Sequence, residues 1–146
     1  MQEYLRFDCM RDYFNRDGYY FQQTLGRKLL VTPHSHDFYE MICVLSGSCV
    51  HIVNGLEMSC AEGDMILLRP DDVHSFSCQS EGTNIAALSA AAPEVGSFIA
   101  AYGLGDDAFF GAAQTKIEAP RAVVSKIDRA GFSELCDSVF AMPGDR

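Results

Sequence analysis

The chain has 146 residues, of which 48% are hydrophobic and 21% charged, which is typical of one compact domain with a buried core. Lys and Arg total 11 against 20 Asp and Glu, and the formal net charge of −9 argues against binding of nucleic acid or anionic lipid by this chain alone. No apolar run approaches the ~20 residues that span a bilayer, and the charged start MQEYLRFDCMRDYF has no signal or transit pattern, so we expect a cytoplasmic protein without membrane contact.

Residues 1–18 are polar and aromatic and are expected to form an N-terminal arm. Residues 19–92 consist of short apolar or alternating runs separated by turn residues, which predicts a series of short strands. Asn54-Gly55 lies between two of these runs and is a strong hairpin signal. Strands at this spacing predict an all-β antiparallel sandwich or jelly-roll-like barrel. The predicted strands are Tyr19–Thr24, Phe38–Leu45, Cys49–Val53, Leu56–Cys60, Met65–Leu68, His74–Cys78 and Asn84–Leu88.

The last part of the chain, residues 93–146, is rich in Ala and Gly at helical spacing. Pro93 suits the first turn of a helix, and a second helix is expected from about residue 122 to 140. We therefore predict a barrel with its arm over residues 1–92, followed by C-terminal helices that pack on the barrel, form the contact of a homodimer, or do both. The apolar stripe of the first helix consists of Val95, Phe98, Ile99 and Tyr102.

Six cysteines are present, and no two of them form a Cys-x-x-Cys pair. Without a secretory signal we interpret them as reduced thiols that behave as small hydrophobic residues, rather than as a disulfide framework. They are Cys9, Cys43, Cys49, Cys60, Cys78 and Cys136.

Two of the four histidines stand in the run HSHDFYE at residues 34–40. In a strand, residues of equal parity face the same side, so His34, His36 and Glu40 are expected on one face. Two imidazoles and a carboxylate suit a divalent cation such as zinc, nickel, iron or manganese. His74, at the start of a later strand, is expected to supply a fourth ligand from across the barrel. In a metal-free pocket the same groups would hydrogen-bond sugar hydroxyls, and both interpretations stay open.

The spacing of these residues resembles the two sequence motifs of the cupin family. His34, His36, Glu40 and Gly47 match the four positions of the first motif, and the second motif is matched by Gly63 and His74. The resemblance covers about residues 26–90 and implies a cupin barrel followed by helices.

The stretch from His34 to Phe76 further resembles the N-terminal effector-binding domain of AraC-type transcription regulators. The features are the His-x-His-x-x-x-Glu opening, the Leu-Ser-Gly hairpin, the Asn-Gly turn and Pro-x-x-x-His. The resemblance implies a cupin that senses a small-molecule effector, often a sugar, and helices that form a homodimer contact. It also implies DNA binding only through a C-terminal helix-turn-helix domain that this chain lacks. The branch that senses chitin-derived disaccharides is the nearest in appearance.

Several further residues are candidates for binding the effector. Phe38, Ile42 and Phe76 share parity with the pocket positions and would form apolar walls, although plain core is an equally simple interpretation. If Ser46 and Gly47 are the two turn residues, His51 faces Ile42 and lines the cavity, whereas a three-residue turn would place it on the outside as an exposed or edge histidine. Arg69 stands at a barrel-end loop, where it would bind an anionic group of a ligand or pair with Asp71 or Asp72. Ahead of the barrel, the candidate lid residues are Tyr19, Tyr20, Gln22 and Gln23.

Three functions therefore compete at this point. The first is a ligand-sensing and dimerisation domain of a transcription regulator, without enzymatic activity. The second is a freestanding metal-dependent cupin enzyme, such as a dioxygenase or sugar isomerase, because three histidines and a carboxylate can hold a metal with open positions. The third is a dimerisation scaffold whose interior is filled and binds no ligand.

Overall fold

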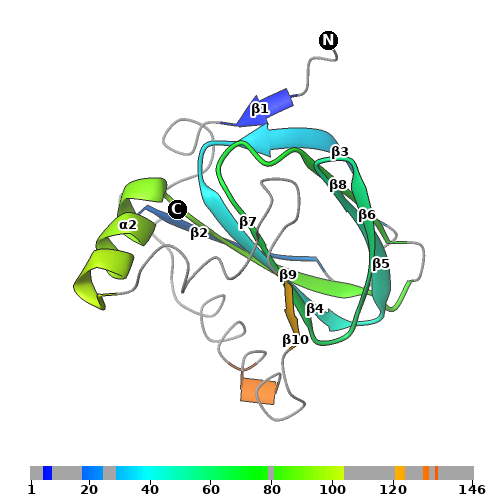
Figure 1. Cartoon of the computed structure of the whole chain (residues 1–146). Helices are drawn as coiled ribbons and strands as arrows, with labels where there is room; N and C mark the ends of the chain where they lie inside the picture. The colour runs from blue at the N-terminus through cyan, green and yellow to red at the C-terminus, as the bar shows by residue number, and fades with distance from the viewer. Residues whose placement is uncertain are drawn as a thin grey trace, which may run out of the picture.

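The computed structural model describes residues 5–7, 18–24, 29–78, 81–103, 121–123, 130–131 and 134. Two five-stranded sheets face each other across an apolar interior (Figure 1). The first sheet has the order β1 (Leu5–Phe7), β3 (Leu29–His36), β8 (His74–Cys78), β5 (Ser48–Val53) and β6 (Leu56–Ala61). The second has the order β10 (Arg121–Val123), β7 (Asp64–Leu68), β4 (Tyr39–Ser46), β9 (Asn84–Ala90) and β2 (Tyr19–Thr24). Neighbouring strands are antiparallel, except that β1 runs parallel to β3.

The predicted β-rich architecture is confirmed, but the predicted closure of the sheets into a barrel is wrong. Within the described residues, hydrogen bonding stops at β1 and β6 in one sheet and at β10 and β2 in the other. The two sheets therefore form a sandwich, in which side chains of both inner faces fill the space between them. The fully buried apolar residues there include Val44, Val53, Ile66 and Leu68.

The chain changes sheets at two places that matter for the site. The first is the bend at Asp37 and Phe38, which separates β3 from β4 and places them in different sheets. The prediction that residues 34–40 form one strand is therefore wrong. The second change is at Gly47, between β4 and β5, where a φ of +77° suits a residue without a side chain. By contrast, the predicted Asn54-Gly55 hairpin is confirmed, because β5 and β6 pair directly with Val53 opposite Leu56.

One helix, α2 (Ala92–Ala101), follows the last long strand. Pro93 lies in its first turn, as predicted, but none of the helix residues is buried, and Phe98 and Tyr102 are 47% and 69% exposed. Residues 121–123 form strand β10 beside β7, so the second helix does not begin near residue 122 as predicted. Ala130, Gly131 and Glu134 are helical, and the remainder of the predicted second helix lies outside the described residues. No helix in the described part of the chain is long and apolar enough to cross a membrane.

Candidate metal and ligand site

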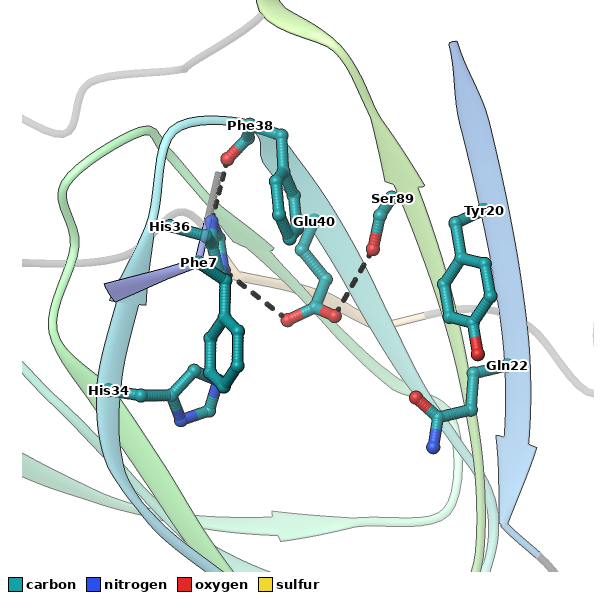
Figure 2. Close-up of a pocket in the computed structure, with 8 residues that line it drawn as sticks. All are labelled: Phe7, Tyr20, Gln22, His34, His36, Phe38, Glu40 and Ser89. Carbon is teal, nitrogen blue, oxygen red and sulfur yellow. Dashed lines mark hydrogen bonds and ion pairs between the residues drawn. The ribbon is translucent and has the colours of Figure 1, made fainter. Parts of the chain in front are cut away.

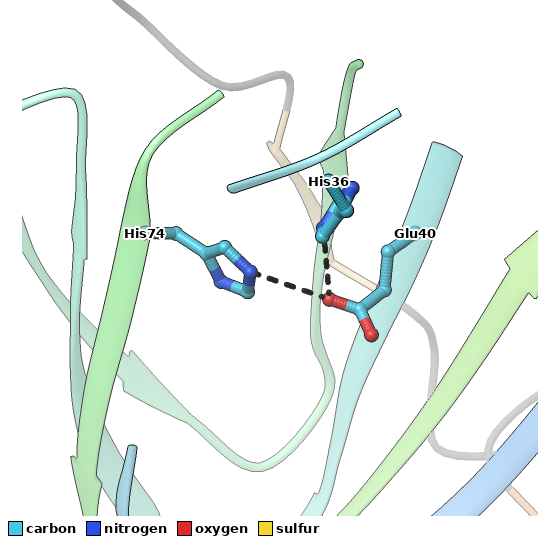
Figure 3. Close-up of side chains that lie close together, drawn as sticks. All are labelled: His36, Glu40 and His74. Carbon is cyan, nitrogen blue, oxygen red and sulfur yellow. Dashed lines mark ion pairs between the residues drawn. The ribbon is translucent and has the colours of Figure 1, made fainter. Parts of the chain in front are cut away.

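His36, Glu40 and His74 meet at one end of the sandwich, although they come from three different strands. Each offers one ligand atom, and these atoms lie within 4.8 Å of one another. One carboxylate oxygen of Glu40 is 3.6 Å from Nε2 of His36 and 3.6 Å from Nε2 of His74 (Figure 3). β3 and β8 are paired in the first sheet and supply the imidazoles, while β4 in the second sheet supplies the carboxylate. The site therefore bridges the two layers of the fold.

The local backbone fixes how His36 presents its ring. Nδ1 of His36 lies 2.8 Å from the carbonyl oxygen of Phe38, just past the bend. A carbonyl can only accept, so Nδ1 carries the proton and Nε2 keeps its lone pair, which faces Glu40. The Phe38 ring stacks on the His36 ring at a centroid distance of 4.0 Å. The main-chain oxygen of His36 accepts a hydrogen bond from the amide of Asp71 at 2.8 Å, so the loop before β8 also fixes this residue.

His74 is positioned by a third histidine. Nδ1 of His74 lies 3.2 Å from Nε2 of His51, and all but 1–2% of each residue's surface is buried. Burial lowers the pKa of His51 to about 4, partly opposed by the negative charge of Glu40. Burial also holds the pKa of His74 well below its usual range, and the neighbouring histidines add to that effect. Both rings are therefore neutral near pH 7, which is the form that binds a metal.

A second observation, the lack of partners for two ring nitrogens, also indicates that this donor set suits a divalent metal. Nε2 of His36 and Nε2 of His74 are buried and have no hydrogen-bond partner among the described residues. Buried polar atoms are nearly always partnered in folded proteins, so two unpartnered ring nitrogens facing one carboxylate suit a cation or a polar ligand. Two histidines and a carboxylate on one side of an ion leave its other positions open to small molecules.

Glu40 also anchors the adjoining cavity. Its second carboxylate oxygen accepts a hydrogen bond of 3.3 Å from the hydroxyl of Ser89, which lies directly opposite it on β9. A cavity of about 80 Å³ opens beside this pair (Figure 2). In Figure 2, Tyr20 and Gln22 of β2 face His34 and His36 of β3 across the space that contains Glu40. The cavity is lined by Phe7, Tyr20, Gln22, His34, His36, Phe38, Glu40 and Ser89.

Of the four metal ligands predicted from the sequence, the structure brings three together. The fourth, His34, lies beside them rather than among them. Its ring centroid is 4.2 Å from that of His74, while its Nδ1 is 2.9 Å from the carbonyl oxygen of Thr32. The pairing of β3 with β8 shifts register between Val31 and His34, and beyond this shift His34 lies directly opposite His74.

The predicted ligand residues fall into three groups. Tyr20, Gln22 and Phe38 line the cavity. Ile42 belongs to the core cluster and Phe76 packs against it, as the simpler interpretation held. Arg69 pairs with Asp72 through two guanidinium hydrogen bonds of 3.1 and 3.3 Å, which confirms the alternative that the sequence left open.

The predicted register of His51 is wrong. β4 and β5 lie in different sheets, so His51 opposes Met58 and Phe76 rather than Ile42. The side chain is nevertheless buried beside His74, although it does not line the cavity. Two cavity residues were missed altogether. Ser89 is the one hydroxyl in the apolar run IAALSA and opposes Glu40, which was a usable signal, whereas nothing local marked Phe7.

Comparison with known proteins agrees with the fold. The family model of the AraC-like ligand binding domain matches residues 26–110. No curated protein sequence matches the chain. The fold is similar to that of ToxT from Vibrio cholerae: the apo K231A protein gives a TM-score of 0.61 at 13% identity, covering 88% of this chain and 49% of that one. ToxT bound to (E)-4-(8-methylnaphthalen-1-yl)but-3-enoic acid gives 0.60 at 14% identity, covering 88% and 51%.

Unsaturated fatty acid bound wild-type ToxT gives a TM-score of 0.60 at 12% identity, covering 85% of this chain and 47% of that one. This chain thus spans about half the length of the ToxT structures that it matches. At these identities the structural likeness shows a shared fold. The family model covers more than half of the sequence, including His36, Glu40 and His74, and on that ground the chain belongs to the family of AraC-like ligand binding domains.

Proposed function

We propose that this chain is the ligand-sensing domain of a transcription regulator, and that its effector binds in the cavity beside Glu40. The observation that carries the proposal is the junction of the two sheets, where His36 and Glu40 line a cavity with aromatic walls and the buried His74 lies 3.6 Å from the Glu40 carboxylate. Polar groups concentrated in a pocket of this kind cost folding free energy unless a ligand uses them. Family membership supports the same role.

A divalent metal is part of this proposal. His36, Glu40 and His74 would hold zinc, nickel, iron or manganese, and His34 would be the fourth donor. His34 lines the same cavity, and its ring is adjacent to that of His74. Such a cation would offer a Lewis-acid position to a ligand oxygen. The protein's own part is to hold the two neutral imidazoles and the carboxylate in place, through the hydrogen bonds at Nδ1 of each ring.

A sugar is the effector that the side chains favour. The carboxylate of Glu40 accepts hydrogen bonds from hydroxyl groups, and aromatic rings such as Phe38 and Tyr20 suit the apolar face of a pyranose. The cavity of about 80 Å³ accommodates one end of such a molecule. The rest would extend past Gln22, which is exposed, toward solvent.

A carboxylic acid is the second candidate effector, because two of the similar ToxT structures contain one. In a metal-free site, Glu40 repels an anionic ligand, whereas a bound cation would attract it. The two classes of ligand therefore differ in how they depend on metal.

Regulation of transcription would require parts beyond those described here. The ToxT chains are about twice as long as this one, and we propose that DNA binding resides in a separate helix-turn-helix domain. We further propose that the protein is a homodimer in which α2 contributes to the contact, since this helix exposes Phe98 and Tyr102. Effector binding would then act by favouring one arrangement of the dimer over another.

Calorimetry on the full chain tests the proposal. Monosaccharides, chitooligosaccharides and a monounsaturated fatty acid are titrated into metal-free and zinc-loaded protein. We expect a saccharide to bind saturably to the wild-type protein and at least tenfold more weakly to Glu40→Gln. The control is Glu57→Gln, which should bind it with unchanged affinity because the Glu57 side chain is exposed on β6. If only the fatty acid binds, the proposed effector is a carboxylic acid and not a sugar. Absence of binding in every series, or turnover of a bound sugar, would overturn the sensor assignment.

A further inference from the structure

A second cluster of reactive side chains lies in the first sheet, apart from the histidine site. Cys49 on β5, Cys60 on β6 and Cys78 on β8 all point into the core and are 8%, 1% and 3% exposed. The thiol of Cys49 hydrogen-bonds with those of both other residues. Neither the candidate site nor the proposed function uses these three thiols.

Strand pairing places two of these cysteines in register for a covalent bond. Cys49 and Cys60 are directly opposite each other in the antiparallel ladder of β5 and β6. Residues in such positions have Cα atoms about 4.5–5.5 Å apart, which lies within the range of about 4.4–6.8 Å that a disulfide requires. We propose that Cys49 and Cys60 form a peroxide-sensitive modification site, which is oxidised to a cross-strand disulfide.

The surroundings of the two thiols assign them different roles. The hydrogen bond from Cys49 lowers the pKa of Cys60; burial opposes this, and the nearby guanidinium of Arg121 reinforces it. The same hydrogen bond and burial raise the pKa of Cys49. Since the thiolate is the nucleophile, Cys60 attacks the oxidant first and Cys49 resolves the product.

The two steps consume one peroxide. The Cys60 thiolate attacks one oxygen of hydrogen peroxide, the O–O bond breaks, and the departing hydroxide takes up a proton, leaving a sulfenic acid and water. The Cys49 sulfur then attacks the sulfenic sulfur, loses its proton, and displaces the second oxygen as water. Two thiols are oxidised to one disulfide, and one peroxide is reduced to two waters.

Strand position favours Cys60 over Cys78 as the partner of Cys49. β6 is an edge strand of its sheet in the described residues, so it can shift to close an S–S bond. β8 is held between β3 and β5, and burial raises the pKa of Cys78.

Peptide mapping of the full chain tests the proposal. The chain is treated with hydrogen peroxide, alkylated, and cleaved after glutamate, which separates Cys49 (peptide 41–57) from Cys60 (58–62) and Cys78 (63–81). We expect peptides 41–57 and 58–62 to be joined through Cys49, with the loss of two hydrogen atoms and reversal by dithiothreitol. Cys49→Ser leaves a sulfenic acid at Cys60 that dimedone captures, and Cys60→Ser abolishes the reaction.

Cys43→Ala is the matched control, because Cys43 is a buried thiol of the second sheet that shares peptide 41–57 with Cys49. This variant should form the same linked peptide. A link from Cys49 to Cys78, a link that disappears in Cys43→Ala, or no link at a peroxide dose that oxidises the urea-unfolded chain would each overturn the proposal.

Discussion

Nε2 of His51 lies 3.2 Å from Nδ1 of His74, and both rings are buried. In this hydrogen bond one nitrogen carries the proton and donates, and the other accepts through its lone pair. If Nδ1 of His74 donates, Nε2 of His74 has its lone pair toward Glu40, as His36 does through its bond to the Phe38 carbonyl. The two imidazoles of the candidate site are then oriented by partners of different chemistry, one a backbone oxygen and the other a side chain that can be replaced.

The first prediction concerns this replaceable partner. His51→Leu removes the acceptor for Nδ1 of His74, so the His74 ring loses its fixed tautomer and orientation. We expect the affinity for zinc, measured by competition with a chromophoric chelator, to fall about 10- to 100-fold. His51→Gln retains a side-chain acceptor and should recover part of that loss. Equal zinc affinity in wild type and His51→Leu would mean that His51 does not orient a metal ligand.

A second prediction follows from burial of the same ring. The pKa of His51 is lowered from 6.5 to about 4 in the folded protein. Above pH 6.5 the ring is neutral in both states, and below it the unfolded chain takes up the proton first, so stability is lost as the pH falls toward 4. From pH 7 to pH 5, this group alone should lower the free energy of unfolding by about 2 kcal/mol.

Urea unfolding in the presence of a chelator measures this effect without competition from bound metal. His51→Gln removes the titrating group, so its stability should fall less steeply between pH 7 and pH 5. His74 contributes in the same direction, because burial also lowers its pKa. Curves of equal slope for the two proteins would show that His51 is not protonated on unfolding in this range.

The sequence predicted the strands far better than it predicted which sheet each one joins. Hydrophobic alternation and Asn54-Gly55 reveal local strands and a local hairpin, and both were confirmed. A change of sheet is set by tertiary packing. The bend at Phe38 has no glycine or proline, so the run from His34 to Glu40 is indistinguishable from one strand by local pattern. His36, Glu40 and His74, which meet in the structure, were still singled out by the spacing that resembles the cupin motifs.

The same limit explains the errors around the cavity. His51 was assigned to a hairpin between β4 and β5, because Ser46-Gly47 has the composition of a tight turn. In the structure the positive φ of Gly47 leads the chain from one sheet to the other. The sequence left open whether His51 faces inward or outward, and the structure buries it in the first sheet. Phe7 could not be found in this way, since it lies in a three-residue strand that pairs with β3 far along the chain.

Gly47 itself gives a third prediction. An added Cβ would lie 2.8 Å from both Cα and Oγ1 of Thr83, and φ is +77°. Gly55 is the matched control, since its φ is +84° but nothing lies within 4 Å of an added Cβ. Gly55→Ala should therefore cost about 1–2 kcal/mol for the left-handed backbone alone. Gly47→Ala should cost a further ~1–3 kcal/mol for overpacking against Thr83. Equal losses in urea unfolding would show that Thr83 moves aside freely.

A fourth prediction concerns the carboxylate that joins β10 to the second sheet. Asp64 accepts hydrogen bonds from the Ala61 amide at 2.7 Å and from the Arg121 guanidinium at 2.6 and 3.1 Å. Burial acts to raise the pKa of Asp64, but these hydrogen bonds outweigh it and hold the pKa below 3.8. Asp64→Asn should therefore lower the free energy of unfolding by about 1–3 kcal/mol at pH 7. Arg121→Gln should cost less, because the arginine side chain is 42% exposed and solvent screens the pair.

The pH dependence separates this pair from the histidines. With a folded pKa below the unfolded one, Asp64 stabilises the protein above pH 3.8 and loses that contribution as the pH falls further. The histidine loss begins at pH 6.5. Asp64→Asn should thus keep the wild-type slope between pH 7 and pH 5 and flatten only the most acidic part of the curve. If the slope of stability against pH changed near pH 6 in Asp64→Asn, the ion pair between β7 and β10 would influence the protonation of the buried histidines.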